Sequence, residues 1–256
     1  MFVKSRISSS PFLLALAGCA LVGIADISTS AQTANYCSIC NGMQTMCRYP
    51  SSAPSKSCQK YVNEPLTAGE IKSLVNRHNE LRTRVAEGRE TAGNSGPQPP
   101  ATDMKALAWD PELARVAQRW ADQCAENAHD DCRSVDRFYV GQNVVTVMTT
   151  GNTFDPIVKL VDPWYNEVKM FNRADVSKYR FESSTGHYTQ LVWGQTSSIG
   201  CGKVRFYNGA RGMNTLRLIC NYGPGGNVIG QRIYTAGKTA SGCTRGKSKA
   251  WPSLCN

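Results

Sequence analysis

The sequence predicts an α+β fold in which helices cover an antiparallel sheet. Apolar residues recur at helical spacing in the first half of the chain, after Pro65. In the second half, three segments alternate apolar and polar residues with a period of two, and Ser- and Gly-rich turns separate them. Helices followed by hairpin-linked strands are typical of this fold class.

The first two helices have clear start signals. One is expected from about Thr67 to about Glu87, because Thr67-Ala68-Gly69-Glu70 has the pattern of a capping box. Another is expected to begin at Asp110-Pro111, where the aspartate can cap the helix and the proline fits its first turn. The apolar face of this second helix would comprise Leu113, Val116, Ala117, Trp120 and Cys124.

A third helix and three strands complete the expected elements. The helix would begin at Asp155 or Pro156, with a break implied by Pro163. Its apolar positions are Ile157, Leu160, Val161, Trp164 and Val168. The strands are predicted over Tyr188–Trp193, Gly200–Phe206 and Thr215–Tyr222. In the first strand, the alternation would place His187, Thr189 and Leu191 on one face.

The N-terminus is predicted to be a secretory signal peptide over residues 1–31. Lys4 and Arg6 form a basic start, an apolar stretch follows, and Thr29-Ser30-Ala31 resembles a cleavage site. The segment carries one of the eleven cysteines, two basic residues and one acidic residue. Its removal therefore leaves ten cysteines and lowers the net charge of +10 by one. We expect a secreted, extracellular protein with no membrane span, because no other apolar run reaches about 20 residues.

Ten cysteines in an oxidising compartment predict a disulfide framework. The spacing of Cys37-Ser38-Ile39-Cys40 also suits a zinc site, but no second such pair follows. Residues 32–64 are predicted to be a cysteine-rich, disulfide-stapled loop region, and residues 65–234 the main domain. Residues 235–256 form a basic tail in which Cys243 and Cys255 would pair.

The net positive charge limits the classes of partner. Anionic polysaccharides, anionic membranes and nucleic acid all attract a basic protein. Secretion argues against nucleic acid. Basic residues are spread along the chain and gather only at Arg245, Lys247 and Lys249, which also suits an ordinary solvated surface.

Four segments together resemble the signature segments of the CAP family, which comprises cysteine-rich secretory proteins, antigen-5 allergens and plant pathogenesis-related proteins. They are His78-Asn79-Glu80-Leu81-Arg82, Gly141-Gln142-Asn143-Val144, Trp164-Tyr165-Asn166-Glu167-Val168, and the stretch from Gly186-His187-Tyr188-Thr189 to Cys220–Asn227. The resemblance spans about Asn35 to Tyr234. Asn35-Tyr36-Cys37 and Ala121-Asp122-Gln123-Cys124 resemble the antigen-5 branch of insect venoms and saliva.

The resemblance implies a three-layer α-β-α sandwich with a central antiparallel sheet and a central groove. Two histidines and two acids line the groove in many members and can hold a divalent cation. These positions fall on His78, His187, Glu167 and Gln142. Because Gln142 replaces an acid with an uncharged amide, we expect weak zinc binding or a structural polar network, and no required cofactor. A lone histidine on an apolar helix stripe, as His78 is, is more often a core residue.

The resemblance also implies four disulfide pairs. They are Cys37–Cys47, Cys40–Cys132, Cys58–Cys124 and Cys201–Cys220. Cys243–Cys255 lies outside the usual insect pattern and is assigned by exclusion.

The sequence favours binding over catalysis. His78 or His187 with Glu167 could supply a general base, but the chain has neither a Gly-x-Ser-x-Gly elbow nor a His-Glu-x-x-His helix. Members of the family sequester lipids, and the segment Val140–Met148, with Val144, Val145 and Val147, could wall a hydrophobic channel. The alternative is that these residues are ordinary core.

Recognition of host proteins is the third class of function. Arg211-Gly212-Met213 and Arg245-Gly246-Lys247 both lack the aspartate of an integrin-blocking tip. By resemblance, a compact member of the antigen-5 branch is an allergen recognised by host IgE. The sequence therefore predicts a secreted, non-enzymatic antigen-5-like salivary or venom protein that scavenges small hydrophobic host mediators or lipids. The alternatives are an effector of host proteins or cell surfaces and, less favoured, a metal-dependent hydrolase.

Overall fold

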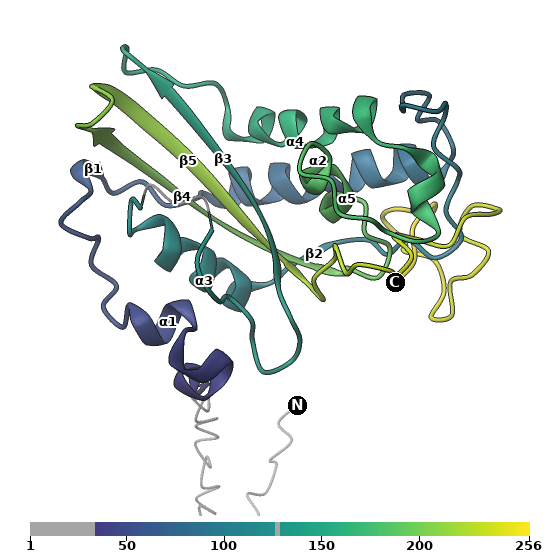
Figure 1. Ribbon diagram of the computed structural model, residues 1–256, viewed down its shortest axis with the longest axis horizontal. Helices are drawn as coiled ribbons and strands as arrows, with labels where there is room; N and C mark the ends of the chain where they lie inside the picture. Colours follow the sequence, from purple (N-terminus) through teal and green to yellow (C-terminus); the bar gives the residue numbers. More distant parts are fainter. Residues whose placement is uncertain (1–33, 126–128) are drawn as a thin grey trace, which may run out of the picture. The chain divides into compact units, whose positions relative to one another are not determined.

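The computed structural model describes residues 34–125 and 129–256 (Figure 1). The expected signal peptide, residues 1–31, lies outside the described residues. In chain order the elements are η1 (Tyr36–Gly42), α1 (Thr45–Arg48), β1 (Gln59–Val62), α2 (Ala68–Ala86), β2 (Ala108–Trp109), α3 (Pro111–Ala121), β3 (Gly141–Thr149), η2 (Ile157–Val161), α4 (Asp162–Asn166), η3 (Glu167–Met170), η4 (Arg173–Val176), α5 (Gly186–Leu191), β4 (Ser198–Asn208) and β5 (Met213–Gly223). The η elements are 3₁₀-helices.

The sheet lies between two helical layers, so the fold is α+β as predicted (Figure 1). The strands run in the order β1-β4-β5-β3, all antiparallel, and the two-residue β2 adds to β4 in parallel, which the sequence did not indicate. Helix α3 packs on one face of β4 and β5, while α2, η2, α4 and α5 pack with the apolar residues of the other face.

Two glycines of β4 let α3 lie directly on the strand. A Cβ atom at Gly200 would come within 2.2 Å of the Ala114 nitrogen, and one at Gly202 within 2.5 Å of the Gln118 backbone. Since real Cβ atoms do not approach backbone so closely, only glycine permits this helix–sheet distance.

The helix start signals are confirmed. Thr67 and Glu70 form the capping box of α2, and Asp110 accepts hydrogen bonds from the Glu112 and Leu113 amides at the start of α3. Helix α3 ends at Ala121, so Cys124 does not continue its apolar face as expected. Cys124 instead has a φ of 47° in the loop that follows, where its disulfide to Cys58 holds it.

The third helix is more broken than predicted. It begins at Ile157 and consists of η2, α4 and η3 in succession. Pro163 occupies the first turn of α4, the position at which a helix tolerates a missing N–H. The break implied by Pro163 is therefore present.

The strand predicted over Tyr188–Trp193 is wrong, because these residues form most of helix α5. Tyr188, Leu191 and Val192 are all buried, and their spacing of three and four is helical. A segment of six residues satisfies the strand alternation and the helical spacing equally well. Tertiary contacts, described below, select the helix.

Strand β3 was not predicted as a strand, although its residues had been singled out as a channel wall. The pleat sends Val144 to the cluster under α3, and Val145 and Val147 to the main core. Strand β1, within the expected loop region, was also missed. Its four residues are mostly exposed and show no apolar alternation.

Five disulfides tie the described chain together. They are Cys37–Cys47, Cys40–Cys132, Cys58–Cys124, Cys201–Cys220 and Cys243–Cys255, the same five pairs expected above. The C-terminal pair lies against the segment before β2, where the Cys255 amide donates to the Met104 carbonyl. Between these two cysteines Arg245, Lys247 and Lys249 are exposed.

No helix in the described part of the chain is long and apolar enough to cross a membrane.

A buried arginine connects α2 to two distant segments. Arg82 has no exposed surface, and burial lowers its pKa to about 9, so it is charged at neutral pH. Its guanidinium donates to carbonyl oxygens before β2 and after α5. These acceptors are the carbonyls of Lys105, Leu191, Trp193, Gly194 and Thr196. The planar fork of arginine can satisfy this set, whereas a single ammonium cannot.

Replacing Arg82 with lysine should therefore destabilise the fold strongly. The charge stays buried while several carbonyls lose their donor, so Arg82→Lys should lower the free energy of unfolding by about 3 kcal/mol or more. Urea denaturation measures this. Arg211→Lys, on the exposed turn between β4 and β5, is the matched control and should change stability by about 0.5 kcal/mol or less. Equal stability of the two variants would contradict the role given to Arg82.

Candidate functional site

Glu167 and His187 form a close pair at the start of α5. The His187 Nδ1–H donates to Glu167 Oε1 over 2.6 Å. The other oxygen, Oε2, accepts from the backbone amides of His187 and Tyr188, at 2.9 and 3.1 Å. The carboxylate thus caps α5, whose first N–H groups have no partner within the helix. Its side chain is 16% exposed and that of His187 is 34% exposed.

The Gln142 side chain, on β3, has three hydrogen-bond partners. Its Oε1 lies 2.7 Å from Nδ1 of His129, and its Nε2 donates to Asn221 Oδ1 at 2.9 Å and to Asp130 Oδ1 at 3.2 Å. Because the amide oxygen can only accept, His129 carries its proton on Nδ1. The next residue of β3, Asn143, donates to the His187 carbonyl at 3.0 Å. Strand β3 therefore contacts both histidine-bearing segments.

His129 is the residue that the sequence analysis missed. Burial lowers the pKa of His129, and the positive charge of Arg133 acts in the same direction. We name His129, Gln142, Glu167 and His187 the polar cluster. The only sequence signal for His129 is its place shortly before Cys132 and Gln142.

His78 belongs to the core and not to the polar cluster. The expectation that it lines a groove with Gln142, Glu167 and His187 is therefore wrong. It is fully buried; Nδ1 donates to the Leu74 carbonyl and Nε2 accepts from the Tyr222 hydroxyl, both at 2.8 Å. Both ring nitrogens are used in joining α2 to β5. Trp164 contacts both imidazoles, with ring centroids 6.3 Å from His78 and 6.3 Å from His187.

The polar cluster offers few ligands for a metal ion. Among residues 34–125 and 129–256, no three His, Cys, Asp or Glu side chains are arranged to hold one. The oxygens of Glu167 and the amide of Gln142 already have partners. Only the Nε2 atoms of His129 and His187 have no hydrogen-bond partner in the described chain. Two imidazoles do not make a closed tetrahedral zinc site.

A cavity of about 370 Å³ lies at the far end of β3 and β5. Its lining residues are Val147, Thr149, Thr153, Phe154, Asp155, Leu160 and Leu216. Val147 and Leu216 are opposite each other in the β3–β5 register. Of the three valines predicted to wall a channel, Val147 lines this cavity. The pleat turns Val144 to the other face of the sheet, and Val145 packs against the main core.

Comparisons with known proteins agree with this architecture. The model of the family described as "Cysteine-rich secretory protein family" matches residues 75–222. Venom allergen 3 of Solenopsis invicta is 46% identical over 209 residues, which cover 78% of this chain and 88% of that protein. Venom allergen 5.02 of Dolichovespula maculata is 45% identical over 205 residues, covering 78% and 94%.

Solved structures share the fold. The structure of BmVAL-1 is 28% identical with a TM-score of 0.62, and the match covers 74% of this chain and 95% of that chain. The crystal structure of NaASP2 with Zn²⁺ is 24% identical with a TM-score of 0.61, covering 80% and 100%. At that identity the second likeness shows the fold alone.

Burial of His78 should make the fold acid-sensitive. Its pKa is about 4 in the folded protein, against an ordinary 6.5. Below pH 6.5 the unfolded chain takes up a proton that the folded chain refuses, so stability falls between pH 6.5 and 4, by about 3 kcal/mol. Urea denaturation at several pH values measures this. His78→Gln should lose this share of the pH dependence, and an unchanged pH slope in that variant would contradict it.

Any zinc binding should depend on His129 and His187. Calorimetry measures it. We expect weak heats in the wild type, none in His129→Ala/His187→Ala, and no change in His78→Gln. Gln142→Glu supplies a carboxylate and should tighten binding at least about tenfold, since one charged ligand is worth more than 1.4 kcal/mol. Unchanged heats in the double histidine variant would remove the polar cluster as a zinc site.

Proposed function

This chain belongs to the cysteine-rich secretory protein family as an antigen-5-like member, and from that membership we propose that it is a secreted allergen that acts by binding. Its relatives in ants and wasps are named venom allergens. The five disulfides suit an oxidising extracellular compartment. Antibody recognition of such a rigid folded surface by host IgE needs no active site.

The polar cluster supports a non-enzymatic role. A general base needs a lone pair within reach of substrate, and the Glu167 carboxylate, with three internal hydrogen bonds, is poorly placed to supply one. Of the polar cluster, only the Nε2 atoms of His129 and His187 keep a lone pair without a partner in the described chain. Glu167 makes those three bonds as the cap of α5. The ten cysteines of the described chain are all in disulfides, so none is a nucleophile. We therefore assign Glu167 a structural role as the cap of α5, and we propose no catalytic step for the polar cluster.

The proposed ligand is a small hydrophobic molecule in the cavity at the far end of β3 and β5. The observation that carries this is the lining itself: Val147, Leu160 and Leu216 form an apolar surface beside the Phe154 ring. Its volume of about 370 Å³ falls within the range of small-molecule sites. Arg205 lies over the Phe154 ring, at 5.4 Å, and pairs with Glu64, so its charge is already compensated.

A neutral fluorescent probe tests the cavity. N-phenyl-1-naphthylamine should bind the wild-type protein, and Val147→Phe should weaken binding at least about tenfold by filling the space. Met148→Phe is the control, because Met148 is exposed on the same strand and does not line the cavity. Equal dissociation constants for wild type and Val147→Phe, with both variants folded, would reject the cavity as the ligand site.

A further inference from the structure

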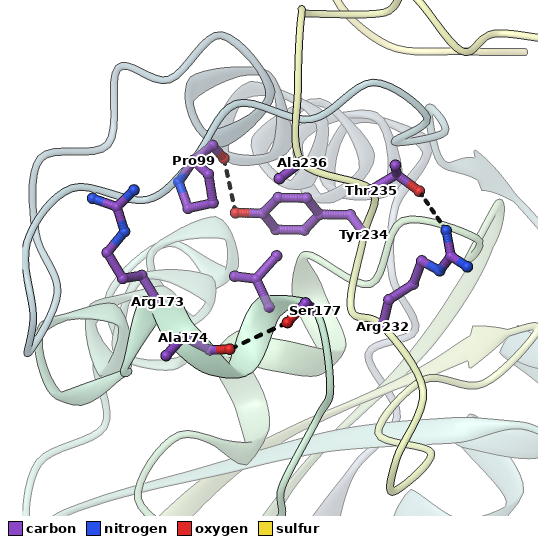
Figure 2. Close-up of a pocket in the computed structure, with 9 residues that line it drawn as sticks. Pro99, Arg173, Ala174, Ser177, Arg232, Tyr234, Thr235 and Ala236 are labelled. Carbon is purple, nitrogen blue, oxygen red and sulfur yellow. Dashed lines mark hydrogen bonds between the residues drawn. The ribbon is translucent and has the colours of Figure 1, made fainter.

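A second cavity, of about 520 Å³, lies between η4 and the segment that leads into the C-terminal tail (Figure 2). We call it the arginine pocket. Its lining residues are Pro99, Arg173, Ala174, Val176, Ser177, Arg232, Tyr234, Thr235 and Ala236. It shares no residue with the polar cluster or with the apolar cavity. Neither the sequence motifs nor the proposed function uses it.

The centre of the arginine pocket is apolar. Val176 and Tyr234 are each only 2% exposed. The Tyr234 hydroxyl donates to the Pro99 carbonyl at 2.9 Å, so its polar group is already satisfied (Figure 2). The Thr235 amide also has a hydrogen-bond partner, because it donates to Asp103. The pocket therefore presents a ring and alkyl groups at its centre, and few free backbone donors that would favour a bare inorganic anion.

Two arginines without an ion-pair partner in the described chain flank this centre. Arg173 and Arg232 stand on opposite sides of the Tyr234 ring (Figure 2). Within the described chain the Arg173 side chain has no hydrogen-bond or ion-pair partner. That of Arg232 has only one long hydrogen bond, 3.4 Å to Thr235 Oγ1.

Of the acidic side chains of the adjoining segments, Asp175, within η4, pairs with Arg180. Asp103 accepts from the uncharged amide and hydroxyl of Thr235, so it keeps its negative charge and leaves two guanidiniums near one carboxylate. A guanidinium without a carboxylate partner retains its full capacity for paired hydrogen bonds to an anion. The rim is thus positively charged while the centre is apolar.

We propose that the arginine pocket binds a small organic anion, with an apolar, preferably aromatic body and a carboxylate or sulfonate-like head group. The body packs on Tyr234 and Val176, and the head group accepts paired N–H bonds from Arg173 or Arg232. The apolar centre disfavours a purely ionic ligand, and the two arginines disfavour a neutral one. This inference is independent of the proposed apolar cavity.

Two matched probes test it by calorimetry on the full mature protein. Naphthalene-2-sulfonate carries the anionic head group, and naphthalene-2-sulfonamide is its neutral counterpart. We expect the sulfonate to bind at least about tenfold more tightly, since hydrogen bonds to charged groups are the stronger kind. Arg173→Gln/Arg232→Gln should remove that difference. Val147→Phe should leave it unchanged, which separates this pocket from the apolar cavity.

The control variant is Arg211→Gln/Arg245→Gln. It removes the same charge from two exposed arginines that also lack carboxylate partners and lie outside the pocket. It should keep the preference for the sulfonate. The proposal is overturned if the wild type shows no preference or no binding, or if the control loses as much affinity as the pocket variant. All four arginines are exposed, so both variants should fold normally.

Discussion

The buried guanidinium of Arg82 is the constraint on which most of the architecture depends. It satisfies carbonyl oxygens from two stretches of chain, one before β2 and one between α5 and β4. Without this cation the carbonyls of Lys105, Leu191 and Thr196 would lose their side-chain donor, which is costly, whereas the Trp193 carbonyl also accepts from the Thr196 amide. Helix α2, which carries Arg82, therefore positions the segment that leads into β2. The end of α5 is held at the same point.

The start of α5 is held by a second charged group. Glu167 accepts from the first amides of the helix and from the His187 side chain. One short helix is thus tied at its N-terminus by a carboxylate and at its C-terminus by an arginine, in agreement with the polarity of the helix dipole. This arrangement holds the His187 side chain against Glu167, while the His187 carbonyl accepts from Asn143 of β3.

The two cavities differ in the chemistry they present. The one beside β3 and β5 is lined by three aliphatic side chains and Phe154 together with Thr149, Thr153 and Asp155, and the arginine over Phe154 is paired with Glu64. The arginine pocket has a similarly apolar centre but keeps two guanidiniums without carboxylates.

The sequence alone determined the features that depend on near neighbours. Thr67 with Glu70, and Asp110 with Pro111, mark helix starts through contacts within one turn, and the hairpin strands β4 and β5 follow from their alternation. The family resemblance supplied the layered fold. It also supplied three of the four positions in the polar cluster, Gln142, Glu167 and His187.

Only the tertiary structure decided the features that depend on distant partners. A pattern of six residues fits a strand or a helix, and Glu167, twenty positions earlier, makes α5 a helix. The sequence shows three histidines alike, but contacts decide that His78 joins α2 to Tyr222, 144 positions away, while His129 binds Gln142. The physical reason is that periodicity reports which face of an element is buried and carries no information about which polar group it will meet there.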